Sequence, residues 1–383
     1  MSRSTDPRHF FQTTSAIETS ARKAAKSKNT KGNPVKLPSK ILAVVADPKD
    51  EGRVYVAEAA GNVKRIVVET GEISATYSGP VAPLTCLTIS PQSGTLYAGC
   101  WDKSIWSWAL GSRRPGRRFQ GHSDFLKAVV VFALQGKEIL VSGSADASII
   151  VWDAATGEKL HTLNGHTRGI LALKIDPEEY DPGKDSVVVF SAGSDREIRR
   201  WKVGVDAAVE IEGTVDIPSP LLAHETSVDA MFFDSDGDMW TASADKSAKC
   251  LSRARNWDAD TTLVHPDFVR DVIVDEESGW VVTGCRDEEV RVWDRGSGKL
   301  HHVFEGHFEE VTGLVLLKGQ LVVSVGIDGT MRKWSLKGAD LAKAIKEAED
   351  EKEGKVVEVE EKKEGVLTKE EEDELAELMG DSD

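Results

Sequence analysis

The chain has 383 residues, of which 40% are hydrophobic, enough for the core of one large all-β domain or of two ordinary domains. Its longest purely apolar run, near residues 128–134, is far shorter than the roughly 20 residues of a membrane-spanning helix, so we expect no membrane partner. The first twenty residues are polar, and they do not predict a secretion signal.

Charge is distributed unevenly along the chain, whose formal net charge is −16. Residues 1–40 carry nine Lys/Arg against two Asp/Glu, whereas residues 339–383 carry seven Lys/Arg against eighteen Asp/Glu. Lys and Arg dominate contacts to phosphates, so the acidic body argues against direct nucleic-acid binding except through the basic N-terminal arm.

The cysteines are few and widely spaced, with no CxxC pattern among them: Cys86, Cys100, Cys250 and Cys285. This usage predicts reduced core thiols in a cytoplasmic or nuclear protein, and neither a disulfide framework nor a zinc site.

Residues 1–36 are rich in Ser, Thr, Lys and Asn, and we predict a basic, mostly disordered arm. Within it, residues 17–26 predict a short basic helix, and residues 9–14 have the aromatic and β-branched content of a strand.

Residues 37–338 contain an internal repeat that we count seven times. The best preserved copy, Gly121–Asp153, opens with Gly-His and closes with Trp-Asp around an apolar run, a Ser-Gly-Ser and an Ala-Asp-Ala turn. The position of the closing Trp recurs every 41 to 50 residues, at Trp108, Trp152, Trp201, Leu251, Trp293 and Trp334. Leu251 replaces Trp in the fifth copy, and the first copy has Ile66 and Ala60 in place of Trp and Asp.

These repeats resemble the WD40-repeat family over about 300 residues. The resemblance implies an all-β, seven-bladed β-propeller in which each blade is a four-stranded antiparallel sheet, and we expect it to be monomeric. The last copy ends with its third strand at residues 334–336, so a strand from the arm should complete the seventh blade. Residues 9–14 and residues 33–37 are both candidates, although Pro34 is tolerable only at a sheet edge.

Residues 339–383 predict an acidic, partly helical tail. Leu341, Ala344, Ile345 and Ala348 follow helical spacing. Residues 368–371 have the form of a capping box that opens a second short helix, with Leu375, Leu378 and Met379 on one face. That helix is either a peptide motif for a partner's groove or a solvated helix without a partner.

Four copies contain a His, a Ser or Thr, an Asp and a Trp at equivalent places, a set that read alone looks like a nucleophile triad. Repetition around a ring argues instead for structure, and the resemblance implies hydrogen-bonded tetrads. The four sets are His122, Ser142, Asp146 and Trp152; His166, Ser191, Asp195 and Trp201; His265, Thr283, Asp287 and Trp293; and His307, Ser324, Asp328 and Trp334.

Other motifs for chemistry are missing from the sequence. Asp234–Asp238 lacks the final Glu and the flanking helices of an EF-hand, so we predict a polar hairpin turn there. Neither a P-loop nor a strand-anchored GxGxxG occurs. We therefore expect no enzymatic activity, no cofactor and no metal.

In the WD40 family, the loops that enter each blade and the turns before the tetrad Asp lie on one face. Exposed aromatic and basic residues there are of the types enriched at interface hot spots, and they are Trp101, Phe125, Lys127, Arg168, Phe268, Arg270 and Arg286. Arg270 and Arg286 together predict a basic spot for an acidic or phosphorylated peptide. The alternative is that they pair with neighbouring acids such as Asp271 or Glu288.

The sequence thus favours a non-catalytic scaffold that assembles proteins in an intracellular multiprotein complex. One alternative is a substrate receptor of a ubiquitin ligase, but the Trp-Asp-x-Arg that many such receptors share is not matched at Trp152 or Trp293. Another is a protein-binding subunit of an RNA-processing or ribosome-assembly particle, which the basic arm favours and the acidic body disfavours.

Overall fold

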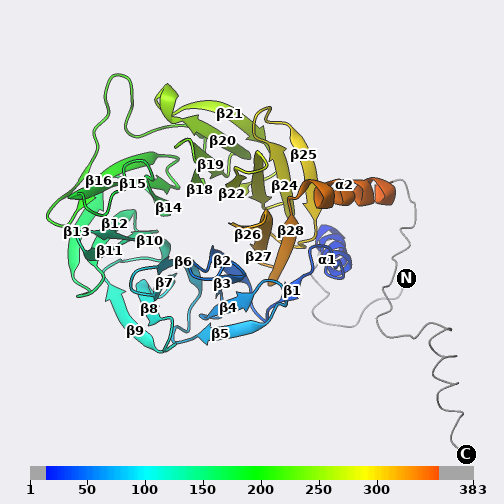
Figure 1. Ribbon diagram of the computed structural model, residues 1–383, viewed down its shortest axis with the longest axis horizontal. Helices are drawn as coiled ribbons and strands as arrows, with labels where there is room; N and C mark the ends of the chain where they lie inside the picture. Colours follow the sequence, from blue (N-terminus) through cyan, green and yellow to red (C-terminus); the bar gives the residue numbers. More distant parts are fainter. Residues whose placement is uncertain (1–13, 353–383) are drawn as a thin grey trace, which may run out of the picture. The chain divides into compact units, whose positions relative to one another are not determined.

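Seven four-stranded antiparallel sheets follow one another around a ring, as the repeats predict (Figure 1). The computed structural model describes residues 14–352, without the side chains of residues 14–19 and of residue 352. The propeller belongs to one compact unit that ends at Lys337, and helix α2 (Gly338–Lys352) belongs to a second unit.

In blades one to six the first strand lies innermost and the later strands follow outward, whereas the outermost strand of blade seven comes from the N-terminal arm (Figure 1). Blade one contains β2 (Ile41–Ala46), β3 (Arg53–Glu58), β4 (Val63–Val67) and β5 (Ile73–Tyr77). Blade two contains β6 (Leu84–Ser90), β7 (Thr95–Cys100), β8 (Ser104–Ala109) and β9 (Pro115–Gln120). Blade three contains β10 (Leu126–Leu134), β11 (Lys137–Ser144), β12 (Ser148–Asp153) and β13 (Lys159–Asn164).

The remaining blades repeat this order. Blade four contains β14 (Ile170–Ile175), β15 (Ser186–Gly193), β16 (Ile198–Gly204) and β17 (Ala208–Glu210). Blade five contains β18 (Val228–Phe233), β19 (Met239–Ser243), β20 (Ser247–Ser252) and β21 (Asp258–Val264), with a short 3-10 turn at Arg253–Arg255. Blade six contains β22 (Val269–Asp275), β23 (Trp280–Cys285), β24 (Glu289–Asp294) and β25 (Leu300–Glu305). Blade seven contains β26 (Val311–Leu317), β27 (Leu321–Gly326), β28 (Thr330–Ser335) and β1 (Val35–Lys36).

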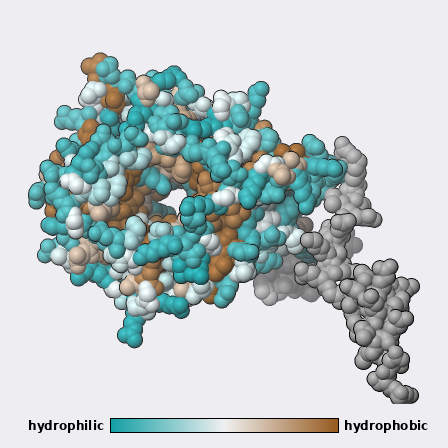
Figure 2. Space-filling model, viewed as in Figure 1, coloured by the Kyte–Doolittle hydropathy of each residue, from teal (hydrophilic) through white to brown (hydrophobic). Residues whose placement is uncertain are grey.

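The hydrophobic core lies between neighbouring blades, because each sheet has a blade on both of its faces. Val141 and Val151 of blade three, for example, pack in one cluster with Leu173 and Val189 of blade four. Strands buried on both faces need apolar residues at nearly every position, which explains the β-branched runs in the sequence. Figure 2 shows hydrophobic side chains around the opening at the centre of the ring.

The N-terminal arm completes blade seven. Strand β1 pairs antiparallel with β28, Val35 opposite Met331, so residues 33–37 are the closing segment, whereas residues 9–13 lie outside the described part of the chain. Gly32, just before the strand, has a φ of 71°, and a Cβ there would lie 2.7 Å from the indole of Trp334. A glycine is therefore required where the arm crosses Trp334.

Helix α1 (Thr14–Lys26) covers the predicted helix at residues 17–26 and extends it toward the N-terminus. Residues 14–36 of the arm form α1, a turn and β1. Two interactions order this part of the arm. Its cations pair with carboxylates of blades six and seven, and its backbone joins a sheet.

Helix α2 contains the helically spaced Leu341, Ala344, Ile345 and Ala348, as predicted. The second expected helix, with Leu375, Leu378 and Met379, falls outside the described residues. Within residues 14–352, neither helix is long and apolar enough to cross a membrane.

Candidate partner-binding face

One end of every blade carries two kinds of connection. In a four-stranded antiparallel blade, the loop that leads into the first strand and the turn between the second and third strands lie at the same end. We call the surface formed by these loops and turns the loop face. All seven residues predicted to bind partners lie in these loops and turns or within the first two residues of the strands that follow them.

Hydrogen-bonded tetrads tie the loops to the turns in blades three, four and seven. In blade three, Trp152 Nε1 donates to Ser142 Oγ at 2.9 Å, His122 Nε2 lies 2.9 Å from the same oxygen, and His122 Nδ1 lies 3.0 Å from Asp146. The corresponding distances in blades four and seven are 2.7 to 2.9 Å. The Ser hydroxyls of these tetrads are fully buried, so they hold the blade together and cannot reach a substrate.

The aspartates of the tetrads are held ionised by the fold. Burial alone would raise the pKa of Asp146, but hydrogen bonds from Ser148 and from the backbone N–H of Ser123, with the nearby His122, lower it to about 2. Burial lowers the pKa of His122 and His166 despite the neighbouring carboxylates. The rings of His122 and His166 are thus neutral and their partner carboxylates charged at neutral pH, an arrangement that satisfies every buried polar group of these two tetrads.

Blade six does not form the predicted tetrad. His265 Nε2 still lies 2.8 Å from Thr283, but its Nδ1 bonds the backbone oxygen of Leu263, and Asp287 accepts two hydrogen bonds from Arg291 at 3.0 and 2.6 Å. In blades three, four, five and seven, the backbone N–H that follows the His donates to the turn Asp. In blade six that residue is Pro266, which has no N–H to donate.

Blade five keeps three members of a tetrad without the Trp. His224 lies 2.8 Å from both Thr241 and Asp245, while Leu251 occupies the position of the Trp. The loop and the turn are therefore still tied together in this degenerate repeat.

Two aromatic side chains from neighbouring blades meet on the loop face. Trp101 lies in the β7–β8 turn and Phe125 in the loop before β10, and their rings stack with centroids 4.9 Å apart at 15°. Both stay exposed, at 42% and 36%, and the ammonium of Lys127 lies 6.0 Å from the Trp101 ring. Three predicted residues thus form one surface, which we call the aromatic cluster.

The three predicted residues of blade six also meet, but with unequal surroundings. The guanidinium groups of Arg270 and Arg286 lie 5.7 and 4.9 Å from the ring of Phe268. Arg270 is neutralised by Asp229, at 3.1 Å, and by Glu310. Arg286 is exposed and has no acidic partner among residues 14–352.

The expected alternative partners of these arginines are occupied elsewhere. Asp271 accepts the backbone N–H groups of Val272 and Leu314, and Glu288 pairs with Arg22 and Lys26 of α1. Arg286 is therefore the available cation of this spot, and the basic pair predicted from the sequence is reduced to one arginine.

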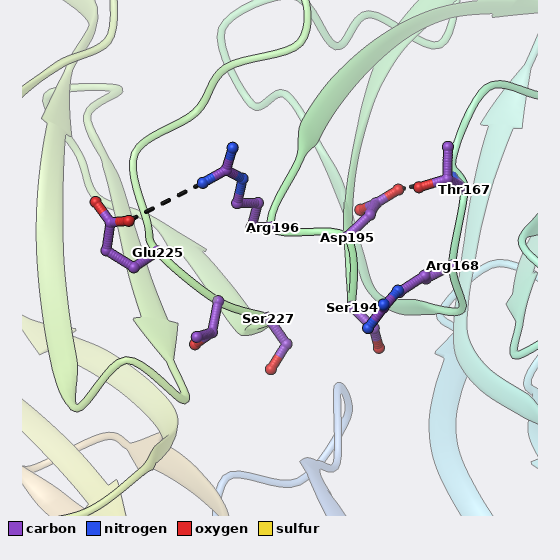
Figure 3. Close-up of a pocket in the computed structure, with 8 residues that line it drawn as sticks. Thr167, Arg168, Ser194, Asp195, Arg196, Glu225 and Ser227 are labelled. Carbon is purple, nitrogen blue, oxygen red and sulfur yellow. Dashed lines mark hydrogen bonds and ion pairs between the residues drawn. The ribbon is translucent and has the colours of Figure 1, made fainter.

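Arg168 lies in a pocket of about 590 Å³ between blades four and five, apart from the other predicted residues (Figure 3). Figure 3 shows Arg168 extending toward Ser194, whereas Arg196 extends toward Glu225. The ion pair between Arg196 and Glu225 is long, 4.0 Å, and both side chains are at least half exposed. The lining is Thr167, Arg168, Ser194, Asp195, Arg196, Glu225, Thr226 and Ser227.

Sequence reasoning missed Arg196, although the signal was present. Arg196 directly follows the turn Asp of blade four, whereas the predicted residues in these turns, Trp101 and Arg286, directly precede that Asp. The pocket offers two guanidinium groups and several hydroxyls, but Arg196 pairs with Glu225, and Asp195 is engaged by His166 and by the backbone of Thr167. Arg168, which has no acidic partner among the described residues, is the group in this lining that suits an anion.

Two clusters of potential metal ligands occur among the described residues, and both have other partners. His166 and Asp195 belong to a tetrad, and Glu197 beside them pairs with Arg199. In the second cluster, of Asp234, Asp238 and Cys250, burial raises the pKa of the thiol to about 12. Asp234 accepts hydrogen bonds from Trp240 and Arg295, so the Asp234–Asp238 segment is the polar hairpin turn that was predicted.

The four cysteines are free and buried. Burial raises the pKa of each thiol to about 12. They behave as small apolar side chains of the core, in agreement with their spacing in the sequence.

Seven repeated blades and a loop face with exposed aromatic and basic side chains define a propeller of the interaction-scaffold class. The family description "WD domain, G-beta repeat" matches residues 71–109, 113–153, 157–202, 259–294 and 298–335. The chain belongs to the WD40-repeat family, whose propellers are generally non-catalytic and bind proteins. The stretches without a match include most of blades one and five, the two degenerate repeats.

Relatives with this repeat differ widely in their described roles. A WD repeat-containing protein of Schizosaccharomyces pombe, described as uncharacterized, is 34% identical over 348 residues, 86% of this chain and 89% of the relative. Nuclear distribution protein nudF of Aspergillus niger is 25% identical over 281 residues, 72% of this chain and 55% of the relative. Pre-mRNA-processing factor 19 homolog 2 of Arabidopsis thaliana is 24% identical over 213 residues, 53% of this chain and 37% of the relative.

Proposed function

We propose that this protein is a non-catalytic scaffold that assembles proteins in an intracellular multiprotein complex, and that the loop face binds them. The observation that carries the proposal is the aromatic cluster. Trp101 and Phe125 stack on each other and still leave 42% and 36% of their surfaces exposed. Rigid aromatic side chains that stay exposed on a well-ordered surface are typical anchors of protein interfaces.

The arginines indicate the chemistry of the partner. Arg286 and Arg168 are exposed and have no acidic partner in the described part of the chain, and the pocket around Arg168 adds Arg196 and hydroxyl donors. A guanidinium group binds carboxylate and phosphate oxygens in a bidentate manner, so the preferred ligand is an acidic or phosphorylated segment.

Partner binding should therefore depend on side chains of the loop face, whereas the stability of the fold should not depend on them. We expect the changes Trp101→Ala, Arg286→Ala and the pair Arg168→Ala/Arg196→Ala to weaken partner capture about tenfold or more, since truncation of a hot spot costs about 2 kcal/mol. Quantitative mass spectrometry of proteins captured by the tagged full chain measures this effect. Thermal unfolding should change little, because surface substitutions away from packed sites are nearly neutral.

Arg117→Ala is a matched control, because Arg117 is an exposed arginine on outer strand β9, away from the loop face. An unchanged partner set for all three loop-face variants, or an equal loss for Arg117→Ala, would show that the loop face is not the binding surface.

A second candidate is a protein-binding subunit of an RNA-processing particle, which the similarity to pre-mRNA-processing factor 19 homolog 2 favours. Treatment of the captured complexes with RNase distinguishes the two. Partners that remain bound, and are lost only in the loop-face variants, support direct protein contacts. Partners that are released support an RNA-dependent assembly.

A further inference from the structure

Helix α1 lies against a group of carboxylates on the loop face of blades six and seven. Arg22 pairs with Glu288 at 2.7 Å, and Lys26 pairs with Glu288 and Glu289 at 2.9 Å. Lys23 pairs with Glu309 at 2.8 Å. Glu288 lies in the β23–β24 turn, the adjacent Glu289 begins β24, and Glu309 lies in the loop before β26, so two separate segments supply one acidic site.

The attachment of α1 to this acidic site is electrostatic. None of the helix side chains from Ser20 to Lys26 is buried, and the side chain of Arg22 is 55% exposed. Exposed ion pairs are individually weak and are screened by salt. The helix segment whose side chains are described, Ser20–Lys26, is therefore held by charge complementarity and can leave without uncovering buried side chains of its own.

The carboxylates, in contrast, need a cation above them. With α1 in place, the side chain of Glu288 is only 6% exposed and that of Glu289 only 14%. Burial raises the pKa of Glu289 despite the nearby ammonium of Lys26, and its Oε2 has no hydrogen-bond partner among the described residues. A site with closely spaced, partly desolvated carboxylates favours any ligand that brings positive charge in the right geometry.

The chain after α1 is fixed independently of the helix. Asn29 donates to the backbone oxygen of Glu305, and the buried guanidinium of Arg332 donates to the backbone oxygens of Asn29 and Lys31. The backbone N–H of Lys333 bonds Gly32, and β1 follows. Displacement of α1 would therefore leave blade seven closed.

We propose that Glu288, Glu289 and Glu309 form a binding site for a basic helix of a partner protein, and that α1 is the resident ligand which such a helix displaces. The sequence of α1 indicates which features such a ligand needs. It needs cations at positions i, i+1 and i+4, as in Arg22, Lys23 and Lys26, with small residues between the second and third cations that allow the helix to approach the site closely. This site binds the opposite charge from the arginines of the proposed function, and it does not depend on them.

The short connection from α1 to Asn29 sets the strength of the competition. A tethered helix acts at an effective concentration on the order of millimolar, so a free helix of equal affinity competes poorly. The partner must add contacts of its own, or bind when α1 is weakened. The tethered helix α1 thus prevents weak basic ligands from binding to the acidic site.

The test compares the full chain with a chain that lacks residues 1–27, using a fluorescent synthetic peptide of residues 14–28 as the probe. A permuted peptide of the same composition, in which Arg22, Lys23 and Lys26 exchange places with Ala21, Ala24 and Ala25, is the matched control. Fluorescence anisotropy at low salt should show the probe binding the shortened chain at least about tenfold more tightly than it binds the full chain. The permuted peptide, whose cations have the spacing i, i+3 and i+4 in place of i, i+1 and i+4, should bind the shortened chain about tenfold more weakly than the probe.

Glu288→Gln/Glu289→Gln/Glu309→Gln in the shortened chain should abolish the binding, and added salt should weaken it. If the shortened chain does not fold, Arg22→Ala/Lys23→Ala/Lys26→Ala in the full chain opens the same site. Equal binding of the probe and the permuted peptide, or no binding to a folded open chain, would overturn the proposal. A concentration-dependent dimer of the full chain with exchanged α1 helices, seen by sedimentation, would also overturn it and assign the site to a second copy.

Discussion

Replacing Trp334 with Ala is expected to lower the free energy of unfolding by about 3–5 kcal/mol, the usual cost of removing a large buried aromatic side chain. Trp334 is 5% exposed, donates to Ser324 at 2.8 Å and stacks on Phe304 with centroids 4.8 Å apart. It also covers Gly32, where the arm crosses blade seven. One substitution therefore removes a tetrad member and the surface on which the closing segment rests.

Urea unfolding followed by circular dichroism measures this loss, and Trp280→Ala is the matched control. Trp280 begins β23, is partly exposed and stacks on His301 at the surface, so its removal should cost less than half as much. Hydrogen exchange of residues 29–36 should accelerate in Trp334→Ala and stay unchanged in Trp280→Ala. Equal losses of stability in the two variants would mean that Trp334 has no special role in closing the ring.

Stability should fall in acid partly because of His265. Burial, then the charge of Arg291, lowers the pKa of His265 to about 4, whereas an unfolded His titrates near 6.5. Between pH 4 and pH 6.5, His265 binds a proton in the unfolded chain but not in the folded chain, so the free energy of unfolding decreases as the pH falls. The neutral, buried state of His265 contributes about 3 kcal/mol to the free energy of unfolding. This contribution is fully present above about pH 6.5 and is lost as the pH falls toward 4.

Other groups also bind protons between pH 4 and pH 6.5, so the experiment compares the pH dependence of stability in the wild type with that in variants. Burial raises the pKa of Asp229 and Asp271 to about 6, and these carboxyls take up protons in the folded chain first, which opposes the effect of His265. We expect the stability difference between the wild type and His265→Gln to shrink from pH 7 to pH 4. Arg291→Gln should shift the pH at which this stability difference is lost to a higher value, because removing the cation beside the imidazole raises the pKa of His265. A difference that does not vary with pH would contradict this account.

The periodic part of the structure was readable from the sequence, because the tetrad residues recur at fixed places in every complete repeat. Blade six shows the limit of that pattern. All four tetrad positions are filled there, yet Pro266 cannot supply the backbone N–H that helps to hold the turn Asp in other blades, and Arg291 takes Asp287 instead. Both residues are visible in the sequence, but their effect follows from hydrogen-bond donors and not from repeat spacing.

Contacts between different blades could not be predicted from the repeats. Arg270 and Arg286 look alike in the sequence, but Arg270 contacts Asp229 of blade five and Glu310 in the loop before β26 of blade seven, each about 40 residues away. The ion pair of Arg22 with Glu288 spans 266 residues. The closing strand is only two residues long, too short for an alternating pattern, so composition alone left two candidates.

The closure of the ring by β1 also orders events during protein synthesis. Val35 leaves the ribosome long before its partner Met331, and at about 5–20 residues per second the delay is roughly 15–60 s. During that time the closing segment has no sheet to join, and blade seven is completed only when nearly the whole chain exists. A chain whose synthesis stops before Thr330 lacks the residues that pair with β1, so its ring cannot close. Ring closure therefore distinguishes complete chains from incomplete ones.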